Sequence, residues 1–267
     1  MQRPPHLPNF DEPPLNEVVL GVQFAPLTPF NSVYLREIWD LYRDKYPKVQ
    51  EFASLPPHFE TFGGQEILPP FRVQFGGAPP GSRIWFVAEE ENRLLQFQPD
   101  RFLANWRKNS DQHHYPRFET IAETYRIDLD KLATYLHKRF RHVMDINQAE
   151  LTYINIIEVD DFSEISNWLN LLNNVSIDVE GLVVDLREII KNGEDRPFAR
   201  FYHSVQAVRS LDGGRKAINL SLSVRGKPES RDINSAMMFL QIAREAIVTR
   251  FDKITTENAH THWGKKK

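Results

Sequence analysis

The order of strand-like and helix-like segments repeats once along the chain, and this repeat is the strongest constraint on its fold. In the first half, strand-like segments precede a long segment, Pro116 to Val143, that carries one apolar stripe. In the second half, Asp232 to Thr255 has the same place and a similar stripe. Such stripes need an apolar partner, and a sheet supplies the largest one. We therefore expect an α+β fold of two similar β-α-β-β-β-α halves, with antiparallel sheets that carry the long helices on one face.

Apolar and β-branched residues mark the strands of both halves. The predicted strands are Glu17–Phe24, Phe71–Phe75, Arg83–Ala88, Leu94–Gln98, Glu150–Val159, Leu182–Leu186, Phe198–Arg209 and Lys216–Arg225. A shorter helix is expected to start at Asn31 or Ser32, and another at Ser163, because these residue types cap helix N-termini. Phe52 to Pro70 is rich in proline and glycine, so we predict a loop there.

The chain divides into an arm and two halves. Residues 1–16 form an extended proline-rich arm, residues 17–146 a first α+β half and residues 147–267 a second one. The halves share the order of their elements without visible sequence identity. A structural duplication and an ordinary α+β arrangement both agree with this pattern, as does one continuous domain.

Composition excludes several classes of protein. The chain has no cysteine, which rules out disulfides, cysteine-ligated zinc and thiol catalysis. Its formal net charge of −3 argues against a general binder of nucleic acid. The start lacks the features of a signal peptide, and no apolar run reaches the ~20 residues that a membrane helix needs. We expect a cytoplasmic protein that does not interact with membranes.

No motif in the sequence identifies a reaction. It lacks the dinucleotide-binding, P-loop and serine-hydrolase motifs, so we assign no catalytic residue and expect no cofactor. His260 and His262 are two residues apart, but a metal site needs further ligands, and we predict no metal. We interpret the tail instead as a structural segment in which Trp263 docks on the body and Lys265–Lys267 stay free.

The densest group of unusual side chains lies in 98–119, where cations alternate with aromatic residues. This segment follows the end of a predicted strand and precedes a long helix. Arginine suits anionic groups and aromatic rings offer stacking surfaces. Our first candidate site is therefore Arg101, Trp106, Arg107, Tyr115 and Arg117. We expect a Trp106→Ala, Arg107→Ala double variant to stay folded. The alternative is a loop whose aromatic rings pin it to the core while its charges face water.

A second candidate is the face of the sheet that the helices leave uncovered. In Lys216–Arg225, polar residues alternate with buried ones, and the first half has comparable positions. The secondary candidates are Arg72, Gln74, Gln96, Gln98, Asn219, Ser221, Ser223 and Arg225. An ordinary solvated sheet face is the alternative interpretation.

Five segments together resemble one family. They are Pro13–Phe24, Leu94–Lys108, Tyr115–Glu119, Glu150–Asn155 and Ala259–Gly264. This ordered set is similar to a sporadically distributed family of uncharacterised prokaryotic proteins. The resemblance implies a prokaryotic, cytoplasmic protein and gives no catalytic residue. Sporadic distribution is typical of mobile genes, including defence and toxin–antitoxin operons.

Two functions follow as hypotheses. The first is a non-enzymatic binding module with an unknown protein partner, because the chain has polar surface positions and no reaction motif. The alternative is a nucleic-acid-binding or nucleotide-binding protein that uses segment 98–119. This alternative includes a nuclease-like enzyme.

Overall fold

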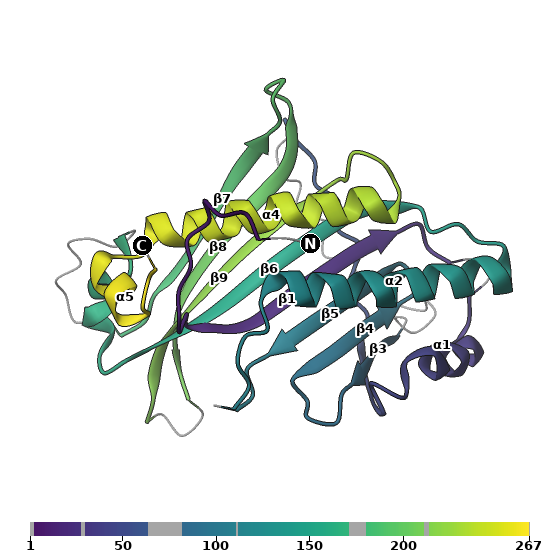
Figure 1. Cartoon of the computed structure of the whole chain (residues 1–267), viewed down its shortest axis with the longest axis horizontal. Helices are drawn as coiled ribbons and strands as arrows, with labels where there is room; N and C mark the ends of the chain where they lie inside the picture. The colour runs from purple at the N-terminus through teal and green to yellow at the C-terminus, as the bar shows by residue number, and fades with distance from the viewer. Residues whose placement is uncertain are drawn as a thin grey trace, which may run out of the picture.

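The strands of the protein join into a single antiparallel sheet. A computed structural model describes residues 3–27, 30–63, 82–110, 112–170, 180–210 and 214–266. Across these residues the sheet contains nine strands, in the spatial order β2-β3-β4-β5-β1-β6-β9-β8-β7 (Figure 1). The strands are β1 (Leu15–Phe24), β2 (Lys48–Ala53), β3 (Ser82–Val87), β4 (Arg93–Gln98), β5 (Arg101–Arg107), β6 (Ile146–Val159), β7 (Val183–Lys191), β8 (Pro197–Arg209) and β9 (Lys216–Gly226). Pairing of β1 with β6 joins the first half to the second.

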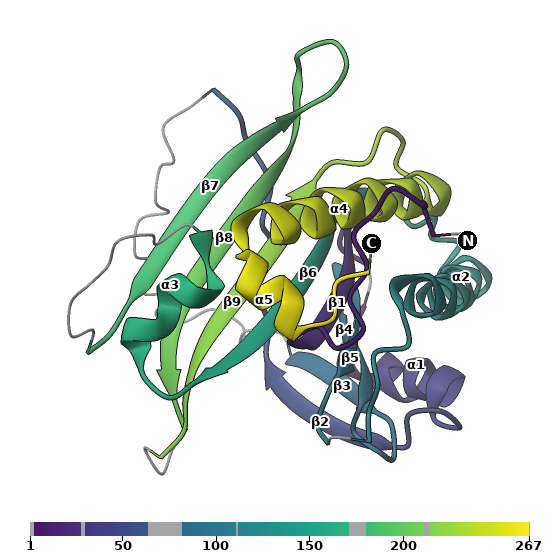
Figure 2. The same ribbon diagram turned by 60° about the vertical axis from the view of Figure 1, so that its left-hand side comes forward.

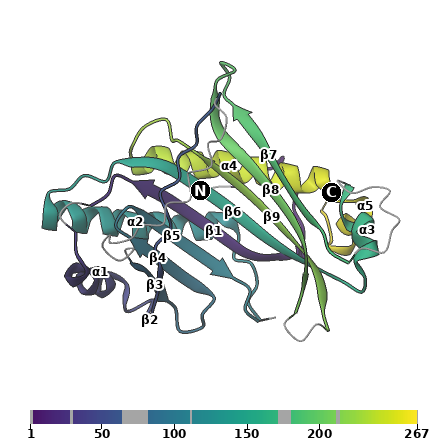
Figure 3. The ribbon, with the colours of Figure 1, turned by 180° about the vertical axis from the view of Figure 1, so that it is seen from behind.

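Helices cover one face of this sheet. The two long helices, α2 (Phe118–Phe140) and α4 (Ile233–Ile254), lie next to each other on it (Figure 1), and Figure 3 shows the sheet from the opposite side. The other helical elements are η1 (Ser32–Tyr34), α1 (Leu35–Tyr42), η2 (Phe162–Glu164), α3 (Ile165–Trp168) and α5 (Glu257–His262). The predicted antiparallel sheet with long helices on one face is confirmed. No helix in the described part of the chain is long and apolar enough to span a bilayer.

Two strands of the first half, β2 and β5, were not predicted. β2 is at the edge of the sheet, and most of its side chains are exposed, so its sequence lacks an alternating apolar pattern. β5 is a central strand whose charged residues made segment 98–119 resemble a loop. The predicted strand Phe71–Phe75 lies outside the described residues. The first half thus has one strand more than the second among the described residues, and the duplication stays a hypothesis.

Alternation along each strand separates a core face from an open face. On β1, Val18, Leu20 and Val22 are at most 1% exposed and belong to the core under the helices. Glu17 and Gln23 point to the other side of the sheet, as the period of two in a strand requires. We call this other side, which carries no long helix, the open face.

The N-terminal arm packs against the C-terminal segment. Phe10 and Lys265 form an isolated β-bridge, and the amide of Lys266 donates a hydrogen bond to the arm. The Lys265 ammonium pairs with Asp252, and that of Lys266 pairs with Asp11. The expectation that these two lysines stay free is therefore wrong, because carboxylates of the body and of the arm lie within reach.

Trp263 fixes this contact between the two segments. Its side chain is 4% exposed, which confirms the predicted docking. The indole stacks on Trp168 with ring centroids 5.8 Å apart and lies 5.3 Å from the ring of Phe251. Burial of an aromatic side chain of this size contributes roughly 2–3 kcal/mol to folding.

We predict that Trp263→Ala lowers the free energy of unfolding by about 3–5 kcal/mol, because it removes buried area and leaves a cavity. Urea denaturation followed by circular dichroism measures this change. Met238→Ala is the control, because Met238 is 60% exposed and its loss should change stability by less than about 0.5 kcal/mol. Equal stability of the two variants would show that the C-terminal contact is dispensable.

Candidate functional site

The sheet separates the five residues of the first candidate site. Arg101 and Arg107 lie on the open face of β5, whereas Trp106 points into the core on the other side. Tyr115 and Arg117 follow β5 and lie on the helix-covered side with Trp106, whose ring is 5.4 Å from that of Tyr115. The prediction of one centre for all five is wrong, because β5 is a strand and alternate side chains leave it in opposite directions.

On the open face, both arginines already have partners. Arg101 is 7% exposed and donates to the Gln23 side-chain oxygen (2.7 Å) and to the carbonyl of Pro56 (3.1 Å). Arg107 pairs with Glu17 at 2.9 Å, and its guanidinium lies over the Trp85 ring. These contacts explain why charged residues occur on a central strand.

The secondary candidates of the first half are buried in the same network. Gln98 accepts a hydrogen bond from the Leu55 amide (3.1 Å) and donates to the Leu55 carbonyl (3.0 Å). Gln96 donates to the Asn105 side chain at 2.8 Å. Both glutamines are at most 5% exposed, because residues 54–63 cross this part of the open face. Arg72 and Gln74 lie outside the described residues.

The candidates of the second half lie on β9 and face the same side. They are Asn219, Ser221, Ser223 and Arg225. Arg225 pairs with Glu150 at 2.6 Å, and Ser223 accepts a hydrogen bond from Thr152 at 2.7 Å. The predicted clustering of polar residues on one face is correct for these strands, but much of their bonding capacity is used within the sheet.

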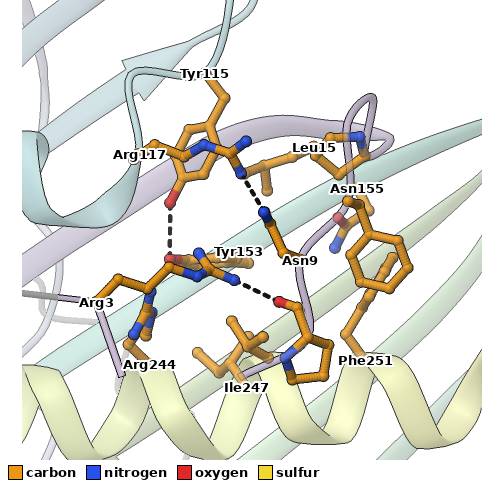
Figure 4. A pocket seen from close by; sticks show the side chains of 14 residues that line it. Arg3, Asn9, Leu15, Tyr115, Arg117, Tyr153, Asn155, Arg244, Ile247 and Phe251 are labelled. Carbon is orange, nitrogen blue, oxygen red and sulfur yellow. Dashed lines mark hydrogen bonds between the residues drawn. The ribbon is translucent and has the colours of Figure 1, made fainter. Parts of the chain in front are cut away.

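A pocket on the helix-covered side collects arginines from three separate segments (Figure 4). It has a volume of about 60 Å³ and lies between the arm, α4 and the strands β1 and β6. Its lining comprises Arg3, Pro8, Asn9, Phe10, Pro13, Leu15, Tyr115, Arg117, Tyr153, Asn155, Arg244, Ile247, Val248 and Phe251. We call it the arginine pocket. Its lining contains three arginines and, among the described residues, no carboxylate.

Among the described residues, the three guanidinium groups have one carboxylate partner between them. Arg244 is 3% exposed and pairs with Glu119 at 2.8 Å, yet its buried Nε atom has no hydrogen-bond partner in the described structure. Arg117 donates to the Asn9 side-chain oxygen at 3.0 Å, and Arg3 donates to backbone carbonyls of the arm. Burial lowers the pKa of Arg3, and the nearby charge of Arg244 lowers this pKa further.

Two tyrosines complete the polar part of the pocket. The hydroxyl groups of Tyr115 and Tyr153 are 3.0 Å apart and share one hydrogen bond, which leaves one of the two protons available to a ligand. Burial raises the pKa of Tyr153 to about 12 and raises that of Tyr115 well above its ordinary value. Both side chains are therefore neutral hydrogen-bond donors near pH 7.

Arg117 adopts an unusual backbone conformation. Its φ of 73° and ψ of 151° belong to a region that is essentially restricted to glycine and costs of order 1–3 kcal/mol for other residues. Arg117 also precedes α2 without providing a side-chain cap, because its guanidinium is directed to Asn9 in the pocket. Arg117, which connects the loop after β5 to α2, therefore has a strained backbone.

A wider pocket of about 580 Å³ adjoins the arginine pocket, since Tyr115 and Arg117 line both. It brings the two unusual segments of the sequence together. Trp106, Lys108, His113 and His114 come from the first segment, and His262 and Trp263 come from the tail. Its volume is within the range of small-molecule sites.

The two histidines of the tail lie in different surroundings. His260 is buried and lies 2.8 Å from the Thr255 hydroxyl, whereas His262 meets the edge of Trp168 at the wider pocket. In the part of the chain that the structure describes, no group of three or more potential ligands is arranged to hold a metal ion.

Sequence reasoning missed three main residues of the arginine pocket. Arg3, Tyr153 and Arg244 come from the arm, β6 and α4, and only folding brings them together. Arg244 gave a signal, because it follows Leu240 by four residues and precedes Ile247 by three, which places a charge on the apolar stripe of α4.

Comparisons with known proteins add little to this geometry. No protein-family model matches the chain, and no curated protein sequence matches it. Among solved structures, a putative protein in the dynemicin biosynthetic locus, DynU16, aligns with 89% of this chain and 97% of its own. The identity is 13% and the TM-score is 0.20, so this likeness carries no argument.

We predict that Trp106→Ala and Arg107→Ala, which lie next to each other in sequence, differ in stability because they face opposite sides. Trp106 is 3% exposed, so its loss should lower the free energy of unfolding by about 3–5 kcal/mol. Loss of the partly exposed Arg107–Glu17 pair should cost only about 0–1 kcal/mol. Urea denaturation of both single variants tests this, and similar losses would place the two side chains in similar environments. The double variant should therefore be strongly destabilised, contrary to the expectation from sequence.

Proposed function

We propose that the protein is a binding protein for a small molecule with an anionic group, and that this group binds in the arginine pocket. The observation that carries the proposal is the uncompensated charge of Arg3, Arg117 and Arg244, whose one carboxylate partner among the described residues is Glu119. Arg244 is buried, and Arg3 and Arg117 are half-buried, so water screens the repulsion among these three like charges only in part, at a cost in stability. A carboxylate or phosphate group removes this cost and supplies an acceptor for the buried Nε of Arg244.

The size of the two pockets supports a small ligand. A volume of about 60 Å³ accommodates a few water molecules or one small anionic group, given about 10–15 Å³ for each water. The wider pocket then receives the rest of the molecule, and Trp106 and Trp263 offer it aromatic surface. Tyr115 lines both pockets and can donate a hydrogen bond near their junction.

The alternative of a nucleic-acid binder has less support. The basic residues of segment 98–119 are divided between two faces, so they do not form one continuous basic surface for a backbone of phosphates. A mononucleotide, in contrast, carries one phosphate group and a planar base, and it agrees with the sizes of both pockets. Binding of a mononucleotide is therefore one outcome of the test below.

We predict that anions which fit the pocket raise the melting temperature in a saturable way. Inorganic phosphate, benzoate and adenosine monophosphate serve as probes, each compared with sodium chloride at equal ionic strength. At ten times the dissociation constant, binding stabilises the fold by about 1.4 kcal/mol, which corresponds to roughly 3–5 °C. Titration calorimetry then gives the affinity of any probe that is bound.

Arg117→Gln tests the site itself, because it keeps the length of the side chain approximately and removes the charge. Loss of a hydrogen bond between charged groups costs about 1.5–3 kcal/mol, so the affinity should fall about 10- to 100-fold. Arg36→Gln is the matched control, since Arg36 is exposed on α1 and does not line the pocket. Equal affinity in both variants, or the absence of saturable stabilisation by all three probes, contradicts the proposal.

A further inference from the structure

The N-terminal arm forms one wall of the arginine pocket. Residues 3–14 cross α4 and then run beside the C-terminal segment, as the dark purple chain in Figure 2 shows. The arm contributes Arg3, Pro8, Asn9, Phe10 and Pro13 to the lining of the pocket, and the strands, α4 and the loop before α2 contribute the other residues. A pocket built in this way is complete only while the arm is docked.

Contacts with the C-terminal segment hold the arm in place. The amides of Asp11 and Glu12 donate hydrogen bonds of 3.1 Å to the carbonyls of residues 264 and 263. Phe10 is 5% exposed and lies against aromatic rings of α4 and of the C-terminal segment. The two amides lose these partners when the arm detaches, so the rate of their hydrogen exchange reports how often the arm is undocked.

Arg3 brings a positive charge of the arm close to two guanidinium groups of the body. Figure 4 shows Arg3 beside Arg244, with Arg117 across the pocket. Burial lowers the pKa of Arg3, and the charge of Arg244 lowers it further, although Glu119 acts in the opposite direction. The hydrogen bonds of Arg3 go to the carbonyls of residues 7 and 8, which belong to the arm and move with it. Repulsion at Arg3 therefore works against the docking of the arm.

An anion in the pocket reverses the sign of this interaction. A carboxylate or phosphate group that is held by Arg117 and Arg244 attracts Arg3 instead of repelling it. Detachment of the arm removes both Arg3 and one wall of the site, so the ligand binds the docked arm far better than the detached arm. A ligand that favours one state of an equilibrium increases the population of that state.

We propose that binding of an anion in the arginine pocket closes the N-terminal arm over the ligand, and that Arg3 is the group through which the arm contacts it. This inference rests on the proposed function, because it requires an anion at that site. The arm of the free protein then opens more often than the arm of the bound protein, and its opening releases the ligand.

Hydrogen exchange of the arm amides tests this coupling in the intact chain. Benzoate, inorganic phosphate and adenosine monophosphate are the probes, with sodium chloride to keep the ionic strength constant, and mass spectrometry follows peptides that contain Asp11 and Glu12. At ten times the dissociation constant measured by calorimetry, exchange of these amides should slow about tenfold, because the detached population falls by this factor. β2, at an edge of the sheet away from the arm, is the internal control and should keep its exchange rate.

Two variants of Arg3 separate the effect of its charge from that of its contacts. Without any probe, Arg3→Gln should slow exchange at Asp11 and Glu12 about two- to fivefold, because the arm then docks against less repulsion. If the contacts of Arg3 served only to hold the arm, the same variant would exchange faster than the parent. Arg3→Lys keeps the charge and should exchange at the rate of the parent. Circular dichroism confirms that both variants are folded.

The outcomes distinguish failure of this inference from failure of the proposed function. Saturable binding of a probe with unchanged exchange at Asp11 and Glu12 overturns the closing of the arm and leaves the proposed function standing. Equal or faster exchange in Arg3→Gln without a probe also overturns the inference alone. If calorimetry detects no binding of any of the three probes, both proposals are overturned.

Discussion

The pairing of β1 with β6 is the interaction on which the rest of the structure depends. It is the contact through which one sheet continues from the first half of the chain into the second, and the remaining strands are added outward from it on both sides. The register of this pair also decides which side chains enter the core. Leu15 of β1 and Tyr153 of β6 reach the helix-covered side and form part of the arginine pocket. The site is thus built across the junction of the halves.

Much of the fold could be predicted because its elements bury regular patterns. The stripes of α2 and α4 and the alternation of β9 record which side of each element faces the core. β2 could not be recognised, since an edge strand with exposed side chains has no such pattern. β5 was missed for a different reason. Its charged residues are satisfied by distant partners such as Glu17 and Gln23, and a sequence does not show which partners folding will supply.

The site was predictable only in part. Segment 98–119 and the tail were recognised by composition, and the structure places both at the wider pocket. The assignment of Arg101 and Arg107 to the same centre as Trp106 failed, because the period of a strand outweighs closeness in sequence. Arg3, Tyr153 and Arg244 reach the arginine pocket from positions far apart along the chain. Of these three, the charge on the stripe of α4 was the one detectable irregularity.

The backbone of Arg117 costs stability, whereas its side chain would contribute to the proposed binding of an anion. Glycine adopts the observed dihedral angles without strain, and it lacks the guanidinium group that lines both pockets. A laboratory selection for thermal resistance alone would consequently favour glycine at this position and enrich chains with a weakened pocket. Selection on binding would retain arginine despite its cost. The residue therefore shows which of the two pressures has acted on any variant of this protein.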